Sequence, residues 1–145
     1  MITAPAQRAP HAAVVLTPNR ILIVDDHTDA RMTLSMVLER MGQQVAEAEN
    51  GASALDAART FHPEIVLCDI GLPDMDGYAV ARAMRADPLL KGIALVAVTG
   101  YGQVEDQSCA FTAGFDRHLT KPFSHDQLME LLLNITDRTT DSPKP

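Results

Sequence analysis

The sequence predicts an α/β fold in which five parallel strands alternate with five helices. From Arg20 onward, short apolar runs with strand character alternate regularly with segments of helical period. Three of these runs are apolar throughout, as expected of strands that helices cover on both faces. A chain of 145 residues has room for one such domain and little more, so any effector is expected to lie mostly on another molecule.

The strands and the first helix follow from these patterns. We expect strands at residues 21–24, 44–48, 65–68, 94–98 and 117–119. Between the first two, Leu34, Val37, Leu38 and Met41 repeat at helical spacing, and Gly42 follows at the position of a left-handed C-cap. The first helix is therefore expected to end at about Met41.

The remaining helices are expected after the turn Asn50-Gly51, over residues 77–86, over 104–113, and from Ser124 onward. The third stops before Pro88, since a proline disfavours helical backbone in the residue before it. Ser124 stands three residues before Gln127, which is the spacing of a capping box. We expect a flexible arm over residues 1–17, an ordered domain over 18–137, and a disordered tail over 138–145, which is rich in Thr, Asp and Pro.

Composition excludes several classes of function. No stretch approaches the roughly 18 apolar residues that span a bilayer, and the N-terminus lacks a secretory signal, so we expect a cytoplasmic protein. A net charge of −7 without a basic cluster argues against direct nucleic-acid binding. Cys68 and Cys109 lack metal-ligand or disulfide spacing and are expected to be reduced structural thiols.

Polar residues gather where the predicted strands end. Asp25 and Asp26 follow the first strand, Asp69 the third, Thr99 the fourth, and Lys121 lies just after the fifth. In an open parallel sheet, ligands bind beyond the carboxyl ends of the strands, near the point where the strand order reverses. All five side chains are therefore expected to meet at one edge.

Three carboxylates in one place need a counter-charge. Two like charges about 4 Å apart repel by roughly 4 kcal/mol at an effective dielectric constant of 20. A divalent cation and Lys121 together would balance the three negative charges. Oxygen ligands without Cys or His at ligand spacing favour Mg²⁺ or Mn²⁺ over zinc.

A metal-bound carboxylate beside a lysine and a hydroxyl suits phosphoryl transfer, in which catalysis is mainly positioning and neutralisation of charge. Asp69 lies on the central strand, with acids on one side and Thr99 and Lys121 on the other. We therefore expect Asp69 to be the nucleophile that forms an acyl phosphate.

Four segments together resemble the signature segments of response-regulator receiver domains of two-component systems: ILIVDDH, VLCDIGLPDMDGYAV, LVAVTGYG and GFDRHLTKPF. The resemblance covers nearly the whole predicted domain. The chain looks like a free-standing single-domain receiver, and its sequence is most similar to the receivers of hybrid sensor histidine kinases. It implies a flavodoxin-like (βα)5 doubly wound parallel sheet with strand order 2-1-3-4-5.

The resemblance also implies roles for the acids. Asp69 is similar to the phosphoacceptor, and Asp26 to a direct metal ligand, with Asp25 acting largely through water. The main-chain carbonyl of Gly71 would complete the metal site.

The remaining roles concern the phosphoryl group. Thr99 resembles the hydroxyl that bonds it, and Lys121 resembles the cation that pairs with it, usually before a cis proline. Gly71 and Tyr101 occupy positions that tune the lifetime of the phosphoryl group in this family.

Some positions depart from the family or remain open. His118 stands where the family often has an aromatic switch residue; it is either a switch in altered form or a surface-facing structural histidine. His27 is expected to start a helix rather than to bind the metal. Asp74 and Asp76 are expected to be turn residues around Pro73 and Gly77.

The implied function is a single-domain response regulator. It would accept a phosphoryl group on Asp69 from a sensor histidine kinase or a histidine phosphotransfer protein, and a downstream protein would read the face of the fourth helix, fifth strand and fifth helix. We expect a monomer or weak dimer with no turnover of an external substrate. Alternatives are a phosphate sink, a non-phosphorylated scaffold, and a metal-dependent phosphatase, which the missing DxDx[TV] loop argues against.

Overall fold

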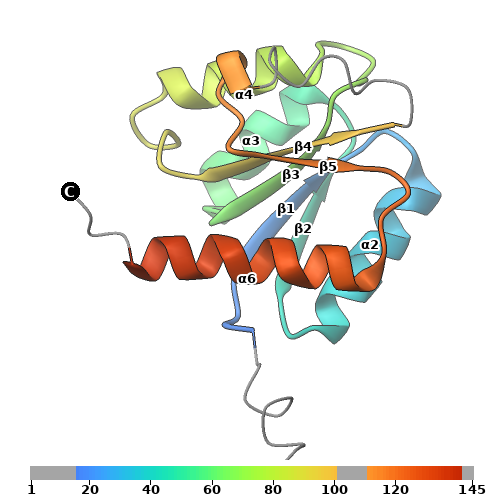
Figure 1. The fold of residues 1–145 in the computed structure, drawn as a ribbon. Coiled ribbons are helices and arrows are strands. Elements are labelled where there is room, and N and C mark those ends of the chain that lie inside the picture. The colour runs from blue at the N-terminus through green and yellow to red at the C-terminus, as the bar shows by residue number, and fades with distance from the viewer. Residues whose placement is uncertain (1–15, 101–110, 142–145) are drawn as a thin grey trace, which may run out of the picture.

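A computed structural model describes residues 16–100 and 111–141, with side chains through Ile135. Five parallel strands form one sheet in the order β2-β1-β3-β4-β5 (Figure 1). Their bounds are β1 Arg20–Val24, β2 Gln44–Ala48, β3 Ile65–Asp69, β4 Ala94–Thr99 and β5 Arg117–Thr120. The predicted fold class and strand order are confirmed.

Helices cover both faces of the sheet. Their bounds are α2 Thr28–Arg40, α3 Gly51–Phe61, α4 Gly77–Ala86 and α6 His125–Asp141. Helices α3 and α4 lie on one face, and α2 and α6 lie on the other (Figure 1). The result is a three-layer α/β/α arrangement.

The two buried layers explain why the central strands are apolar throughout. Leu22 and Val66 point to the side of α3 and α4, whereas their neighbours Ile23 and Leu67 point to the side of α2 and α6. Successive side chains of a strand alternate between faces, so a strand covered on both sides needs apolar residues at every position.

Local capping sets where two of the helices begin. At α3, the Asn50 side chain accepts from the backbone N–H of Ser53 at 2.8 Å, and Ser53 Oγ accepts from the N–H of Asn50 at 3.2 Å. At α6, Ser124 and Gln127 form the same reciprocal pair, with distances of 3.0 and 2.8 Å. The predicted capping box at Ser124 is confirmed, and the pairs satisfy backbone donors that the first helical turn leaves open.

The predicted boundaries differ from the structure at both ends. Leu16 belongs to the predicted flexible arm but is buried in the same apolar cluster as Ile135, because burying its side chain removes apolar area from water. Helix α6 continues past the predicted domain end at Asp137 to Asp141. Within the described ranges, no helix has the length and apolar character needed to cross a bilayer.

The helix predicted at 104–113 lies mostly outside the described residues. Residues 111–113 are helical, and Gly114 follows with a φ of 123°, a left-handed conformation that favours glycine. The described part therefore agrees with the predicted end of that helix.

Gly77 lets α4 start close against the end of β3. Its N–H donates to the carbonyl of Ile70 at 2.8 Å. A Cβ at Gly77 would lie 2.7 Å from the carbonyl oxygen of Asp69 and 2.8 Å from Cα of Ile70. Both of these atoms belong to the backbone, so they cannot rotate away as a flexible side chain could.

We expect Gly77→Ala to lower the free energy of unfolding by about 1–3 kcal/mol, the usual range for forcing an extra carbon into a packed site. Alanine favours a helix over glycine, so a loss must come from the clash. Urea titration followed by circular dichroism measures it. Gly92→Ala is the control, since a Cβ there meets no atom within 4 Å. Equal stability of the two variants would contradict this account.

Candidate functional site

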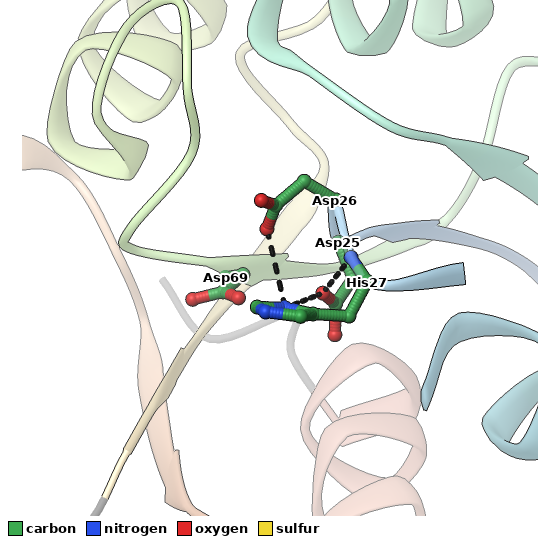
Figure 2. A group of neighbouring side chains, drawn as sticks. All are labelled: Asp25, Asp26, His27 and Asp69. Atoms are coloured by element: carbon green, nitrogen blue, oxygen red, sulfur yellow. Dashed lines mark hydrogen bonds and ion pairs between the residues drawn. The ribbon is translucent and has the colours of Figure 1, made fainter. Parts of the chain in front are cut away.

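Three aspartates come together at the carboxyl edge of the sheet. Asp25 directly follows β1 and Asp69 ends β3, and these strands pair in register with Val24 beside Cys68. One ligand atom from each of Asp25, Asp26, His27 and Asp69 lies within 4.8 Å of the others (Figure 2). The predicted convergence of the acids is thus present, with a histidine added.

Asp25 is buried but well supported. Its side chain is 9% exposed, and Oδ1 accepts from the backbone N–H of His27 at 2.9 Å. The ammonium of Lys121 lies 3.2 Å from Oδ2. Burial opposes ionisation, but the N–H bond and the charge of Lys121 outweigh it, so the pKa of Asp25 lies below its usual value.

Asp69 has weaker support. Its Oδ1 accepts from the N–H of Gly71 at 3.0 Å, and its Oδ2 lies 3.7 Å from the ammonium of Lys121. Burial raises the pKa of Asp69, and the charges of Asp25 and Asp26 add to the rise, which Gly71 and Lys121 offset only in part. The positive charge near Asp69 therefore does not fully compensate its carboxylate when it is ionised.

Asp26 provides the observation that tests the fit of a cation. Although its side chain is 31% exposed, its Oδ1 is shielded from solvent and accepts no hydrogen bond from any group that the structure describes. A shielded carboxylate oxygen without a donor is costly. A divalent cation held by Asp25, Asp26 and Asp69 would satisfy it, and their oxygens are the donors that Mg²⁺ and Mn²⁺ prefer.

Thr99 ends β4 and Lys121 directly follows β5, so both lie at the same edge of the sheet as the acids. The residue before Thr99, Val98, pairs in register with Asp69, and the carbonyl of Thr99 accepts from the N–H of Lys121 at 2.8 Å. The Lys121-Pro122 bond is cis, as the family resemblance implied. Lys121 bridges two acids, as its distances to Asp25 and Asp69 show.

The hydroxyl of Thr99 is held by His118. Thr99 is 2% exposed, and its Oγ1 lies 2.9 Å from Nε2 of His118. His118 is half-buried, and this burial lowers the pKa of its imidazole, which favours the neutral form. The structure therefore differs from the interpretation of His118 as a purely surface-facing residue, because its ring turns inward to bond Thr99.

Sequence reasoning missed the role of Asp74. Its Oδ1 and Oδ2 accept from the N–H groups of Gly51 and Ala52 at 2.7 and 3.0 Å, which ties the loop after β3 to the start of α3. These bonds lower the pKa of Asp74. Its partners lie far away in sequence, so no local pattern could reveal them. Asp76, by contrast, caps α4 by accepting from Ala79 at 2.9 Å.

Other predicted residues remain without a test. The structure shows the N–H of Gly71 bonded to Asp69, and a metal-binding role of its carbonyl stays a prediction. Tyr101 and Cys109 lie outside the described residues. Cys68 is buried and free, and burial raises the pKa of its thiol, so it fits the predicted structural role.

A cavity of about 610 Å³ opens beside the acids between α2 and α6. Asp25, Asp69 and Lys121 are among its polar lining residues, and Leu34 and Phe123 are among its apolar ones. The Asp69 side chain, although only 12% exposed, therefore lines this cavity.

Comparison with known proteins agrees with this geometry. Residues 21–133 match the family model of the response regulator receiver domain. The chain belongs to the response-regulator receiver family. It is thus a receiver of two-component phosphorelay signalling, and its acidic cluster could hold a divalent metal.

Two proteins and one solved structure illustrate the similarity. This receiver is 33% identical over 128 residues to the DNA-binding dual master transcriptional regulator RpaA of Synechocystis sp., covering 86% of this chain and 53% of RpaA, about half its length. It is 34% identical to protein PilH of Pseudomonas aeruginosa, covering 78% of this chain and 93% of PilH. A putative response regulator from Chloroflexus aurantiacus superposes with a TM-score of 0.79 at 33% identity, covering 84% of this chain and all of that one.

We expect Asp69→Asn to stabilise the metal-free receiver at neutral pH, on the order of 1 kcal/mol. The pKa of Asp69 is higher in the folded state than in the unfolded state. Between these two pKa values the native state binds more protons, so the contribution of Asp69 to the free energy of unfolding falls as pH rises through that window. Urea titrations of wild type and variant in EDTA, from pH 4 to 8, measure the difference.

The difference in the free energy of unfolding between Asp69→Asn and wild type should increase as pH rises. Added Mg²⁺ should then narrow it, because the cation compensates the charge in wild type only. A variant less stable than wild type at pH 7 in EDTA would show that Lys121 and Gly71 already suffice for Asp69.

Proposed function

We propose that this receiver accepts a phosphoryl group on Asp69 from the phosphohistidine of a sensor histidine kinase or a histidine phosphotransfer protein, with Mg²⁺ or Mn²⁺ bound at the acidic cluster. The observation that carries this proposal is the position of Asp69. Its carboxylate lies close to a lysine ammonium and to two further acids, and Asp69 lines a cavity.

The reaction requires an ionised, oriented Asp69. The N–H of Gly71 orients the carboxylate through Oδ1. A carboxylate oxygen attacks phosphorus, the P–N bond of the phosphohistidine breaks, and its electron pair returns to the imidazole nitrogen, leaving an acyl phosphate on Asp69. A cation held by the acids would supply positive charge that lowers the pKa of Asp69 and offsets the charge of the phosphoryl oxygens.

The two acids after β1, Asp25 and Asp26, would contribute to the cation site in different ways. Both oxygens of Asp25 already have partners, His27 N–H and Lys121, whereas Oδ1 of Asp26 accepts no hydrogen bond from the described part of the chain. This difference supports Asp26 as a direct ligand, with Asp25 acting through water. The carbonyl of Gly71 is proposed as a further ligand.

Lys121 lies close enough to both Asp25 and Asp69 to pair with either of them. In the described state its ammonium lies 0.5 Å closer to Asp25 than to Asp69, at 3.2 against 3.7 Å. With the charge of Asp25 compensated, the phosphoryl group would be the stronger partner for Lys121. Lys121 would then stabilise the acyl phosphate.

The switch begins at Thr99. In the tautomer in which the Thr99 hydroxyl donates to Nε2 of His118, the hydroxyl must give up this bond to donate to the phosphoryl group, which would free the imidazole on β5 to rotate. A downstream protein would read the change on a face that includes β5 and α6 and, as the resemblance implies, the helix predicted at 104–113, of which residues 104–110 lie outside the described residues. A partner that prefers the phosphorylated shape 100-fold would shift the equilibrium by about 2.7 kcal/mol.

The same chemistry would serve a phosphate sink, which differs only in lacking an output partner. The proposal includes a cytoplasmic location, a monomer or weak dimer, and no turnover of an external substrate. Gly71 and Tyr101 are proposed to tune the lifetime of the phosphoryl group.

Incubation with acetyl phosphate and Mg²⁺ should add one phosphoryl mass to wild type, and none when EDTA replaces Mg²⁺ or in Asp69→Ala. Intact mass spectrometry reads the result. Asp56→Asn is the control, since its side chain is 85% exposed on α3, away from the site, and it should label as wild type does. Labelling of Asp69→Ala would show that the phosphoacceptor is assigned wrongly, and no labelling of folded wild type would support a scaffold.

The switch predicts a change in affinity for beryllofluoride, which mimics the phosphoryl group. A neutral hydrogen bond contributes about 0.5–1.5 kcal/mol, so His118→Phe, which cannot hold Thr99, should tighten binding of beryllofluoride about two- to tenfold. His118→Gln keeps a polar group and should change it less. Titration by NMR measures both, and identical affinities of wild type and His118→Phe would mean that the Thr99–His118 bond persists on activation.

A further inference from the structure

His27 turns its imidazole toward the acids rather than toward the helix that it precedes. It is the N-cap residue of α2, yet its side chain makes no capping hydrogen bond. Instead, Nδ1 lies 3.3 Å from Oδ1 of Asp25 and 3.4 Å from Oδ1 of Asp26 (Figure 2). The ring remains 72% exposed, so neighbouring side chains do not force it into this position.

These distances match those between ligands of one metal ion. In an octahedral site with bonds of about 2.1 Å, adjacent ligand atoms lie about 3 Å apart and opposite ones about 4.2 Å apart. The Nδ1 of His27 stands at nearly the adjacent-ligand spacing from two carboxylate oxygens, and all four ligand atoms, including that of Asp69, fall within 4.8 Å. Shifts of a few tenths of an ångström would bring Nδ1 of His27 and the oxygens of Asp26 and Asp69 onto one ion, which Asp25 would contact through water.

The backbone also favours this placement. The N–H of His27 donates to Oδ1 of Asp25 at 2.9 Å, which fixes the start of the side chain beside the acid pair. Coordination through Nδ1 would leave Nε2–H on the exposed side of the ring, where water can accept from it. A neutral imidazole adds no charge, so the balance between the acids, Lys121 and a divalent cation is unchanged.

We propose that Nδ1 of His27 is a ligand of the divalent cation, and that this nitrogen makes the site prefer Mn²⁺ over Mg²⁺. The proposal rests on the metal site of the proposed function and specifies its ligands further. Imidazole binds first-row transition metals well, whereas Mg²⁺ prefers oxygen ligands and water. Mg²⁺ would still bind through the carboxylates, with water in place of the ring.

The alternative is that His27 only pairs with the acids when no metal is present and swings into solvent when a cation enters. Its exposure permits this movement. The two cases differ in whether the bound ion has a nitrogen neighbour, which a spectroscopic measurement can report without any phosphorylation.

The experiment uses the full chain and Mn²⁺ and Mg²⁺ alone. Calorimetric titration gives the affinity for each ion in wild type, His27→Ala and His125→Ala. The last removes an exposed imidazole that lines the same cavity and controls for general loss of a histidine. We expect His27→Ala to weaken Mn²⁺ binding about tenfold and Mg²⁺ binding less than about twofold, and His125→Ala to change neither.

Pulsed EPR of bound Mn²⁺ provides the direct readout. Wild type and His125→Ala should show modulation from the imidazole ¹⁴N, and His27→Ala should lose it; circular dichroism verifies that each variant is folded. Absence of ¹⁴N modulation in wild type, or an unchanged ratio of Mn²⁺ to Mg²⁺ affinity in His27→Ala, overturns the inference.

The same data separate this inference from the proposed function. If the inference fails while Asp69 still takes a phosphoryl group with Mg²⁺, the proposed function stands with an all-oxygen site. If neither cation binds wild type and Asp69 does not label, both fail together.

Discussion

Three carboxylates share one edge of the sheet with a single lysine ammonium, and this imbalance of charge governs the site. The three acids are compensated to different extents. Asp25 has the shorter contact with Lys121 and accepts a hydrogen bond from a backbone N–H, whereas Asp69 has a longer contact with Lys121 and a raised pKa. One oxygen of Asp26 accepts no hydrogen bond from the described groups. Like charges held by rigid strands cannot relax apart. The negative charge of the three acids is therefore not fully compensated by Lys121, and a divalent cation would compensate the remainder.

The frame that holds these acids is stiff because it is apolar on both faces. Strands β1 and β3 are buried under helices on each side, so Asp25 and Asp69 stand at the ends of segments with little freedom to move. Gly77 allows α4 to begin against the backbone of Asp69, and Asp74 ties the same loop to α3. The reactive carboxylate is thus positioned by packing, while its ionisation is left to Lys121 and a cation.

The residues that the proposed switch would move are Thr99 and His118, on β4 and β5. Thr99 is buried, and among the described residues its hydroxyl bonds to His118, whose imidazole has a lowered pKa and is half-buried on an outer strand. A single neutral hydrogen bond is worth about 1 kcal/mol, which a charged phosphoryl oxygen can outcompete. This separation of a rigid acceptor from a weakly held hydroxyl is what the proposed switch requires.

The sequence by itself determined the strands, most helix boundaries, the capping box at Ser124 and the acids that converge, because these depend on local periodicity and on the rule that parallel strands end at one edge. Only the tertiary structure decided that Leu16 belongs to the core, that Asp74 binds the start of α3, that His118 bonds Thr99, and that His27 faces the acids. The first three depend on contacts between segments distant in sequence. The last depends on a side-chain rotamer, which no residue pattern specifies because the exposed ring has several open to it.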